Sequence, residues 1–536
     1  MQSHLAKMQS GQVSFMAIVS LCLLGQEVCG QIPTACSDVT SLENLECCPA
    51  TSDGVCGEDV GRGQCTDLNL PRYDRKSADV RHNWPHYFTR VCKCNGNYAG
   101  YDCSRCKFGH YGPDCSQSKV LLRRPLATYT DSDWATYIDT ILQSRLFDSG
   151  YMIVLEEAVP GTTNLSMTNI SLYNLFVWMH HYAAKDSATL DLENRLDYAH
   201  AGPAFTTWHK YFHLLFEWEI QYMLKSRGHM DYHTFRLPYW DWRIEIQRST
   251  GILAEDLFTE KRLGATRNVS GFPQVFGDIV GDGWNTICWQ KFFQICDPNV
   301  NTGPLQRCPF TRTNPCNSNN PDWPTSHQVN CAMAFTRYDS PPYNILSRKN
   351  YRSFVDGDIG NNIPKCRKDR MCLCLPSFDP DCAFTASKGS QMIALTQQMH
   401  GAVHTITGAG DAAARLPFNK RGQMDDVVSS PNDPLFTPHH VMIDCMFDEW
   451  LKLHPDTEYP NDIPITVPTT GHQPDDFLVP FFLLSTNTDM FKRSHNFGYF
   501  CILPKIKNRI LPKIKSRILS KIKIHILNII NFILRN

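Results

Sequence analysis

The sequence has no marked excess of positive or negative charge. Over 536 residues, 52 lysines and arginines stand against 53 aspartates and glutamates. Binding to nucleic acid is favoured by a net positive field, so this balance predicts no nucleic-acid partner. The length allows one large hydrophobic core together with one or two smaller units.

Long hydrophobic runs are missing as well. The apolar stretch from Phe15 to Leu24 is too short to span a bilayer, and small residues near Gly30 follow it. This pattern predicts that residues 1–30 are a secretory signal, cleaved near Gly30. A basic repeat fills residues 500–536, and we expect it to be a tail without fixed structure. A membrane-surface segment is the alternative for this tail, so membrane association stays open.

Three N-x-S sequons agree with export from the cell. They predict glycosylation at Asn164, Asn169 and Asn268. We therefore expect a protein of the secretory pathway, either secreted or held in the lumen of a vesicle. Most cysteines of such a protein form disulfides, because these compartments are oxidising.

Cysteine is abundant, with 23 residues in the chain. Ten of them lie between Cys36 and Cys115, an even number that can close five bridges. Their spacing, with glycines and aromatic residues between them, resembles an EGF-like module over residues 31–120. We expect this module to have a structural or docking role. Removing the two cysteines of residues 1–30 leaves 21, an odd number, and Cys445 in a core helix is the predicted free thiol.

Carboxylates are absent from the histidine motifs. No Glu follows His400, so the H-E-x-x-H pattern of zinc proteases is missing. An E-x-x-H motif is missing here as well, which argues against a carboxylate-bridged di-iron site. The chain instead has two groups of three histidines, which are His180, His200 and His209, and then His400, His404 and His440. Three neutral imidazoles leave one coordination position of a metal open, and an all-nitrogen site suits copper first and zinc second. Two such groups predict two metals that share one small molecule.

Apolar residues recur at helical spacing around these histidines. The pattern predicts a mainly α domain over residues 121–499, in which four amphipathic helices pack as a bundle and point the histidines inward. His400 and His404, four residues apart, leave the same face of one helix. Spacing alone does not fix every ligand. His213 lies one turn after His209 and is a rival, and periodicity cannot choose between His439 and His440.

Longer motifs resemble those of a known family. The sequences FVWMH ending at His180, AHAGPAF around His200, WH at His209 and PYWDW from Pro238 resemble the first copper motif of tyrosinases. Three later segments resemble the second copper motif of the same family. They are His400-x3-His404, NDPLF ending at Phe436, and His439-His440-x3-Asp444-x5-Trp450. The N-terminal cysteines are similar to those of animal tyrosinases and tyrosinase-related proteins. The resemblance covers residues 31–499.

This resemblance implies a type 3 dicopper centre in a four-helix bundle. The first copper would take His180, His200 and His209, and the second His400, His404 and His440. His213 is then a core residue or a contact of a ligand. The implied reaction uses O2 to oxidise small phenols, such as tyrosine, to o-diphenols such as DOPA and these to o-quinones, in melanin-type pigment formation. Asp444, one turn after His440, is expected either to orient a ligand imidazole or to form an ordinary buried ion pair.

Two positions depart from the pattern of tyrosinases that hydroxylate monophenols. Those enzymes often have an Asn directly after the first histidine of the second site and a Glu upstream, where this chain has Gly401 and Asp356. Glycine offers no side-chain hydrogen bond beside His400. The sequence therefore predicts catechol oxidation more strongly than phenol hydroxylation.

Three other functions compete with this interpretation. The first is a zinc-bound, tyrosinase-related isomerase acting on dopachrome, against which the pair His439-His440 favours copper. The second is an oxygen carrier of the haemocyanin type, against which the cysteine-rich module and the single copper domain favour a pigment enzyme. The third is a catalytically inactive matrix protein, which the presence of all six ligands disfavours. A pigment enzyme of this kind is expected in a melanosome-like vesicle or outside the cell.

Overall fold

The computed structural model describes the chain in pieces. They are residues 31–68, 88–155, 166–184, 197–200, 202–244, 257–269, 272–276, 284, 305, 307, 323–324, 326–334, 337–339, 392–408, 422–463, 465 and 470–503. The predicted signal, most of the basic tail, Asn164 and Asp356 lie outside these ranges. Within them, every helix is too short or too polar to span a bilayer.

The N-terminal segment is held together by disulfides. All ten cysteines between Cys36 and Cys115 are paired, as 36–47, 48–65, 56–92, 94–103 and 106–115. The bridges join one short helix, α2 (Val39–Asn44), and a series of short strands: β2 (Glu46–Cys47), β3 (Ala50–Thr51), β4 (Gly54–Val55), β5 (Gly63–Asp67), β6 (Arg90–Cys94), β7 (Tyr98–Ala99), β8 (Arg105–Cys106), β9 (His110–Tyr111) and β10 (Gln117–Ser118). Each bridge contributes about 2–4 kcal/mol by restricting the unfolded chain, so this segment needs little hydrophobic core of its own.

This disulfide-rich segment packs directly on the helical part of the chain. Arg105 forms a bidentate ion pair with Glu219, at 2.9 Å to each carboxylate oxygen, and its guanidinium lies 3.2 Å from the ring centroid of Trp218. The indole nitrogen of Trp218 donates to the carbonyl oxygen of Cys106 at 2.7 Å. Gly109 meets Gly498 so closely that an added Cβ on either would lie within 3 Å of the other's backbone. The contact surface is therefore specific and partly buried.

The rest of the described chain is mainly helical, as the sequence predicts. Its helices are α3 (Asp131–Leu146), α4 (Leu172–Ala184), α5 (Ala204–Ser226), α8 (Ser326–Ala334), α12 (Met392–Gly408), α13 (Phe436–Leu453) and α14 (Asn487–Met490). A capping box between Thr130 and Asp133 starts α3. Helix α5 is followed by Gly228 at a φ of +84°, a backbone conformation that ends helices and favours glycine. The proline of α13, Pro438, lies in its first turn, where no helical hydrogen bond is lost.

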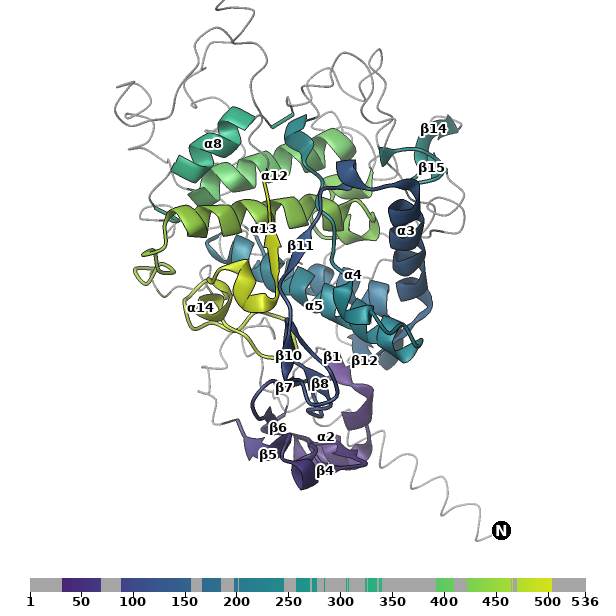
Figure 1. Cartoon of the computed structure of the whole chain (residues 1–536), viewed down its shortest axis with the longest axis vertical. Helices are drawn as coiled ribbons and strands as arrows, with labels where there is room; N and C mark the ends of the chain where they lie inside the picture. Colours follow the sequence, from purple (N-terminus) through teal and green to yellow (C-terminus); the bar gives the residue numbers. More distant parts are fainter. Residues whose placement is uncertain are drawn as a thin grey trace, which may run out of the picture. The chain divides into compact units, whose positions relative to one another are not determined.

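Four of these helices pack together, and they carry all of the predicted ligands except His200, which lies just before α5. Helix α5 contacts α4, α12 and α13, and α12 also contacts α13 and α8; Figure 1 shows α12 and α13 side by side. Aromatic rings pack next to the histidines. The ring centroids are 5.2 Å apart for Phe176 and Phe212 and 5.9 Å apart for Phe212 and Phe436. These rings are buried, so the histidine-bearing faces of the helices rest on a packed apolar layer.

Short strands connect the helices. An antiparallel sheet has the order β1-β12-β13, formed by β1 (Gln31–Pro33), β12 (Asp148–Leu155) and β13 (Ser166–Ser171). A hairpin joins β14 (Ala265–Val269) and β15 (Phe272–Phe276). The pair that matters most for the site is parallel, between β11 (Leu121–Arg123) and β16 (Tyr499–Cys501), because it brings the C-terminal part of the domain against α13.

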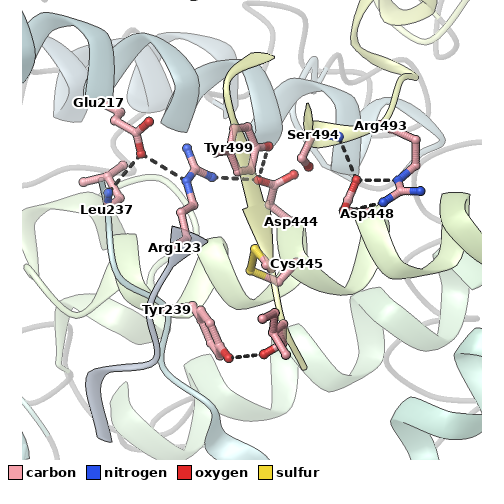
Figure 2. Close-up of a disulfide and its surroundings, with 12 residues drawn as sticks. Arg123, Glu217, Leu237, Tyr239, Asp444, Cys445, Asp448, Arg493, Ser494 and Tyr499 are labelled. Carbon is pink, nitrogen blue, oxygen red and sulfur yellow. Dashed lines mark hydrogen bonds and ion pairs between the residues drawn. A yellow bond between two sulfur atoms is a disulfide. The ribbon is translucent and has the colours of Figure 1, made fainter. Parts of the chain in front are cut away.

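The predicted free thiol at Cys445 is wrong. Cys445 forms a disulfide with Cys501, which lies in β16, 56 residues later (Figure 2). Strand β16 is held beside α13 by its pairing with β11, and this places the two sulfurs together. The odd cysteine required by the count is therefore a different residue.

Candidate metal centre

The first group of histidines comes from two helices and the segment between them. His180 lies on α4, His209 on α5, and His200 just before α5. The ring centroids are 4.9 Å apart for His180 and His200, 5.0 Å for His200 and His209, and 5.6 Å for His180 and His209. The structure thus brings together the three residues that the sequence predicts as one ligand set.

His200 is oriented by Asp197, a residue that the sequence analysis did not identify. One carboxylate oxygen of Asp197 accepts hydrogen bonds from the backbone nitrogens of Ala199 at 3.1 Å and His200 at 2.9 Å, and it lies 3.1 Å from Nδ1 of the His200 ring. A carboxylate cannot donate, so Nδ1 carries the hydrogen and Nε2 is left to bind a metal. The spacing D-x-x-H, typical of a carboxylate that caps the backbone three residues on, is a signal that could have revealed it.

The second group converges on a single point. His400 and His404 lie one turn apart on α12, and His440 lies on α13. Nε2 of His400 is 2.7 Å from Nε2 of His440 and 2.9 Å from Nε2 of His404. The Nδ1 atoms turn outward to backbone carbonyls, from His404 to Met424 at 2.6 Å and from His440 to Phe436 at 3.0 Å. With Nδ1–H donating, the inward nitrogens are acceptors, which is the form in which imidazole binds a metal.

The two groups adjoin each other although about 200 residues separate them in sequence. The rings of His209 and His440 stack with centroids 4.7 Å apart and planes 18° from parallel. His209 also lies 6.3 Å from His400. Packing of α5 against α13 makes this contact, because each helix turns its histidine toward the other.

The surroundings keep these imidazoles neutral. Burial lowers the pKa of His404 to about 4, and it lowers the pKa well below the ordinary value at His180, His209, His400 and His440. Neutral imidazole is the metal-binding form. Nε2 of His209 is buried without a hydrogen-bond partner, and neither ring nitrogen of His180 makes a hydrogen bond, although the backbone of Val428 lies near. Buried polar atoms need a partner, and a metal ion in each group would provide it.

The donor set fits copper. Within the described residues, the groups that can hold a metal at this place are the first triad and a second group of His400, His404, His439 and His440, each with its ligand atoms within 4.8 Å of one another. Both contain imidazoles alone. An all-nitrogen set without carboxylates favours copper over the metals that prefer oxygen ligands, with zinc as the next choice.

Two further histidines lie against the site. His439 is fully buried, and its ring lies 5.1 Å from that of His400. Neither ring nitrogen of His439 makes a hydrogen bond, although the backbone of His400 lies near. His439 is thus a fourth imidazole close to the three predicted ligands of the second group. Nδ1 of His213 lies 2.7 Å from the carbonyl oxygen of His209, and its ring lies 5.8 Å from that of His440, outside both groups.

The other predicted positions have different surroundings. Asp444 points away from the histidines: its carboxylate accepts from Arg123 at 2.8 Å and from the hydroxyl of Tyr499 (Figure 2). Gly401 lies on α12, and a Cβ added there would meet no atom within 4 Å. Asn169 is exposed on β13 and Asn268 lies in β14.

The six predicted ligands differ in exposure. The side chain of His200 is 11% exposed, and His400 and His404 are each 9% exposed, whereas His180, His209 and His440 are at most 1% exposed. The slight exposure of the centre is thus confined to His200, His400 and His404 among the six. The other three histidines face the packed interior.

Comparison with known proteins adds an independent result. A family model for the common central domain of tyrosinase matches residues 170–453, which contain α4, α5, α12, α13 and all six predicted ligands. Over 509 residues the chain is 30% identical to tyrosinase of Pelophylax lessonae, covering 90% of this chain and 84% of that protein. It is 27% identical over 521 residues to 5,6-dihydroxyindole-2-carboxylic acid oxidase of Gallus gallus, covering 91% and 86%. A solved polyphenol oxidase of Thermothelomyces thermophila matches with a TM-score of 0.39 and 15% identity, covering 72% of this chain and 89% of that one.

Proposed function

This chain belongs to the tyrosinase family, and from that premise we propose that two copper ions and O2 serve its reaction. Its activity is the copper-dependent oxidation of phenols and catechols, such as tyrosine and DOPA, to o-quinones in pigment formation. The first copper is held by His180, His200 and His209, and the second by His400, His404 and His440. The observation that carries the proposal is the 4.7 Å contact between His209 and His440, because it makes the two imidazole sets one centre.

Copper bound at these residues would supply O2 binding and electron transfer. A catechol gives up two electrons and two protons when it becomes an o-quinone, so one O2 reduced to water accepts electrons from two catechols. The protein's own part is to fix geometry. Asp197 fixes the tautomer of His200, and the carbonyl oxygens of Met424 and Phe436 do so for His404 and His440.

Substrate binding is assigned to the partly exposed side of the centre. A phenol ring that enters over His400 and His404 would meet imidazole faces. The ring of Phe205 is buried behind them, with its centroid 4.8 Å from that of His400. Aromatic stacking there would orient the ring and exclude water from the metals. The buried histidines on the opposite side, His180 and His209, offer no such entrance.

The finer architecture and the location of the protein are part of the same proposal. We assign α4, α5, α12 and α13 to a four-helix bundle around the two ions, and residues 31–120 to an EGF-like subdomain docked on α5. Contacts of α5 with each of the other three helices support the bundle, and the ion pair between Arg105 and Glu219 supports the docking. The disulfides fit an oxidising compartment, either outside the cell or in a melanosome-like vesicle.

The proposed function is tested by metal content and oxygen uptake. Purified protein is expected to bind two copper ions per chain and to consume O2 with L-DOPA, whereas His400→Ala should lose the second ion and fall to background turnover. Copper analysis and an oxygen electrode measure both. Zinc in place of copper, with isomerisation of dopachrome, would support the zinc-enzyme alternative. Reversible O2 binding without turnover would support the haemocyanin-like one.

Gly401 allows a direct test of substrate preference. Gly401→Asn should raise turnover of L-tyrosine relative to L-DOPA by up to about 100-fold, because the amide adds a hydrogen-bonding group beside His400 that helps remove the phenol proton. The open space around Gly401 accommodates the side chain. Steady-state oxygen uptake on both substrates measures the ratio.

The matched control for this change is Gly401→Ala. It adds a Cβ without an amide and removes the conformational cost of a helical glycine. We expect it to leave the L-tyrosine to L-DOPA ratio as in the parent. An equal rise in both variants would show that helix rigidity, and not the amide, limits hydroxylation.

A further inference from the structure

His472 lies outside both metal groups and yet holds the segment that contains His200. It is buried in the loop before α14. Its Nε2 lies 2.9 Å from the carbonyl oxygen of Asp197, and its Nδ1 lies 3.2 Å from the backbone nitrogen of Ala204. Asp197 precedes His200 by three residues and Ala204 follows it by four. One imidazole therefore joins both ends of the segment.

The two bonds define the state of the His472 ring. The backbone N–H of Ala204 can only donate, so Nδ1 of His472 is the acceptor. Nε2 then carries the hydrogen and donates to the carbonyl of Asp197. Ala204 is the first residue of α5, whose N-terminal N–H groups have no partner within the helix. The neighbouring Pro203 makes no side-chain cap, and His472 takes that role from a distant part of the chain.

The path from His472 to a metal ligand is short. His472 holds the backbone of Asp197, and the carboxylate of Asp197 holds the backbone and Nδ1 of His200. At the other end, Ala204 begins the helix that carries His209. Two of the three ligands of the first group are thus positioned through contacts of one side chain.

The ring of His472 is itself closely confined. A Cβ added to Gly202 would lie 2.5 Å from the His472 ring, so the ring packs flat against this glycine. The hydroxyl of Tyr459 donates to the carbonyl oxygen of His472 at 2.9 Å. Asn487 donates to the carbonyl of Gly471 at 3.0 Å and accepts from Thr207 on α5 at 2.6 Å. The loop is therefore fixed on both sides of the imidazole.

We propose that His472 is a positioning residue for the first metal: it holds Asp197 and the start of α5 so that His200 stays aimed at His180 and His209. The proposal rests on the proposed function for the identity of the metal. It predicts a selective effect. Loss of the His472 contacts should weaken the first site and leave the second, built on α12 and α13, unchanged.

The test replaces His472 and counts bound metal by site. His472→Leu should bind the first copper 10- to 100-fold more weakly, as is usual when a group that orients a ligand is removed. After dialysis against a competing chelator, bound copper should fall from two ions to about one per chain. The remaining Cu(II) should give an EPR signal, because an isolated ion is EPR-active whereas a coupled pair is silent.

His472→Gln is the conservative variant, because one amide offers an acceptor and a donor about as far apart as the two ring nitrogens. It should restore binding of both ions and an EPR-silent centre. The matched control is His454→Leu, which removes a histidine at the end of α13 that belongs to neither metal group. Its ring bonds the carbonyl oxygen of Met333 at 2.9 Å and packs 4.8 Å from the ring of Trp450. This control should keep both ions.

Several results would overturn the proposal. One is His472→Leu retaining both ions with the affinity of the parent, and another is loss of both ions in parallel with a lower melting temperature, as a merely structural role predicts. If His472→Leu does not fold, Gly202→Ala tests the same contact by displacing the ring, and retention of both ions there would also contradict it. A parent protein that binds two zinc ions and no copper would overturn the proposed function instead, and the same count by zinc would then test His472.

Discussion

Replacing His440 by alanine should reduce bound copper from two ions to one per chain and lower oxygen uptake with L-DOPA by roughly 1000-fold or more, since a metal ion contributes several kcal/mol to a transition state. The reason is the convergence of three Nε2 atoms on one point, with His440 only 2.7 Å from His400. Its Nδ1 is fixed on the carbonyl of Phe436, so the inward nitrogen has no other role in the structure described. Copper analysis and an oxygen electrode measure the two effects.

His439 provides a control that differs by one residue in sequence. It is equally buried and lies in the same group of nitrogens, but its ring lies near the backbone of His400 and makes no hydrogen bond to the rings of His400 or His404. We expect His439→Ala to keep both ions and a measurable part of the activity. If His439→Ala loses the second copper while His440→Ala keeps it, the two histidines exchange roles and the ligand assignment made here is wrong.

Local patterns in the sequence predicted the parts of this protein that depend on neighbouring residues. Helical spacing of apolar residues predicted the helices around His180, His209, His400 and His440, because one buried face decides such a pattern. The even number of cysteines between Cys36 and Cys115 predicted that this segment is bridged. The family resemblance supplied the choice of six ligands, which periodicity alone had left open at His213 and at the pair His439-His440.

Apart from Asp197, whose D-x-x-H spacing is local, the errors and omissions concern contacts between distant residues. Cys445 was predicted to be free because its own helix shows no sign of Cys501, whose position depends on the pairing of β16 with β11. His472 was missed for the same reason, since 268 residues separate it from Ala204 and no spacing rule connects them. Asp444 was left with two alternatives, and its contact with Arg123 spans 321 residues. Such contacts are properties of the folded chain and leave no local pattern.

Buried charges cluster around Arg123, between the two helices that carry His209 and His440. Arg123 on β11 is fully buried and bonds Glu217 of α5 at 3.0 Å and Asp444 of α13 at 2.8 Å (Figure 2). Its guanidinium also lies 3.6 Å from the ring centroid of Tyr499 on β16. One side chain thus joins two strands to the two helices that carry His209 and His440. Burial raises the pKa of Asp444, and the nearby cations Lys210 and Arg123 oppose this shift.

Arg123→Met should lower the free energy of unfolding by about 3–5 kcal/mol, because it leaves the buried carboxylates of Glu217 and Asp444 without their shared cation. Chemical denaturation of the parent and the variant under the same conditions measures the difference. The matched control is the adjacent Arg124→Met. Arg124 pairs with Asp133 at 3.1 Å, but the two side chains are 41% and 31% exposed, so its loss should cost less than about 1 kcal/mol.

A third variant separates the loss of charge from the loss of packing. Combining Arg123→Met with Asp444→Asn removes the charge left without its ion-pair partner while keeping the side-chain volumes, because Glu217 retains Arg236 at 3.5 Å. This double variant should recover most of the lost stability. Recovery would show that apolar packing holds together the helices bearing His209 and His440. The buried charges around residue 123 would then need only to be matched by charges of opposite sign. If the double variant is as unstable as Arg123→Met alone, geometry matters more than charge. The guanidinium itself, by bonding α5 and α13 at once, then sets the spacing on which the stacking of His209 on His440 depends.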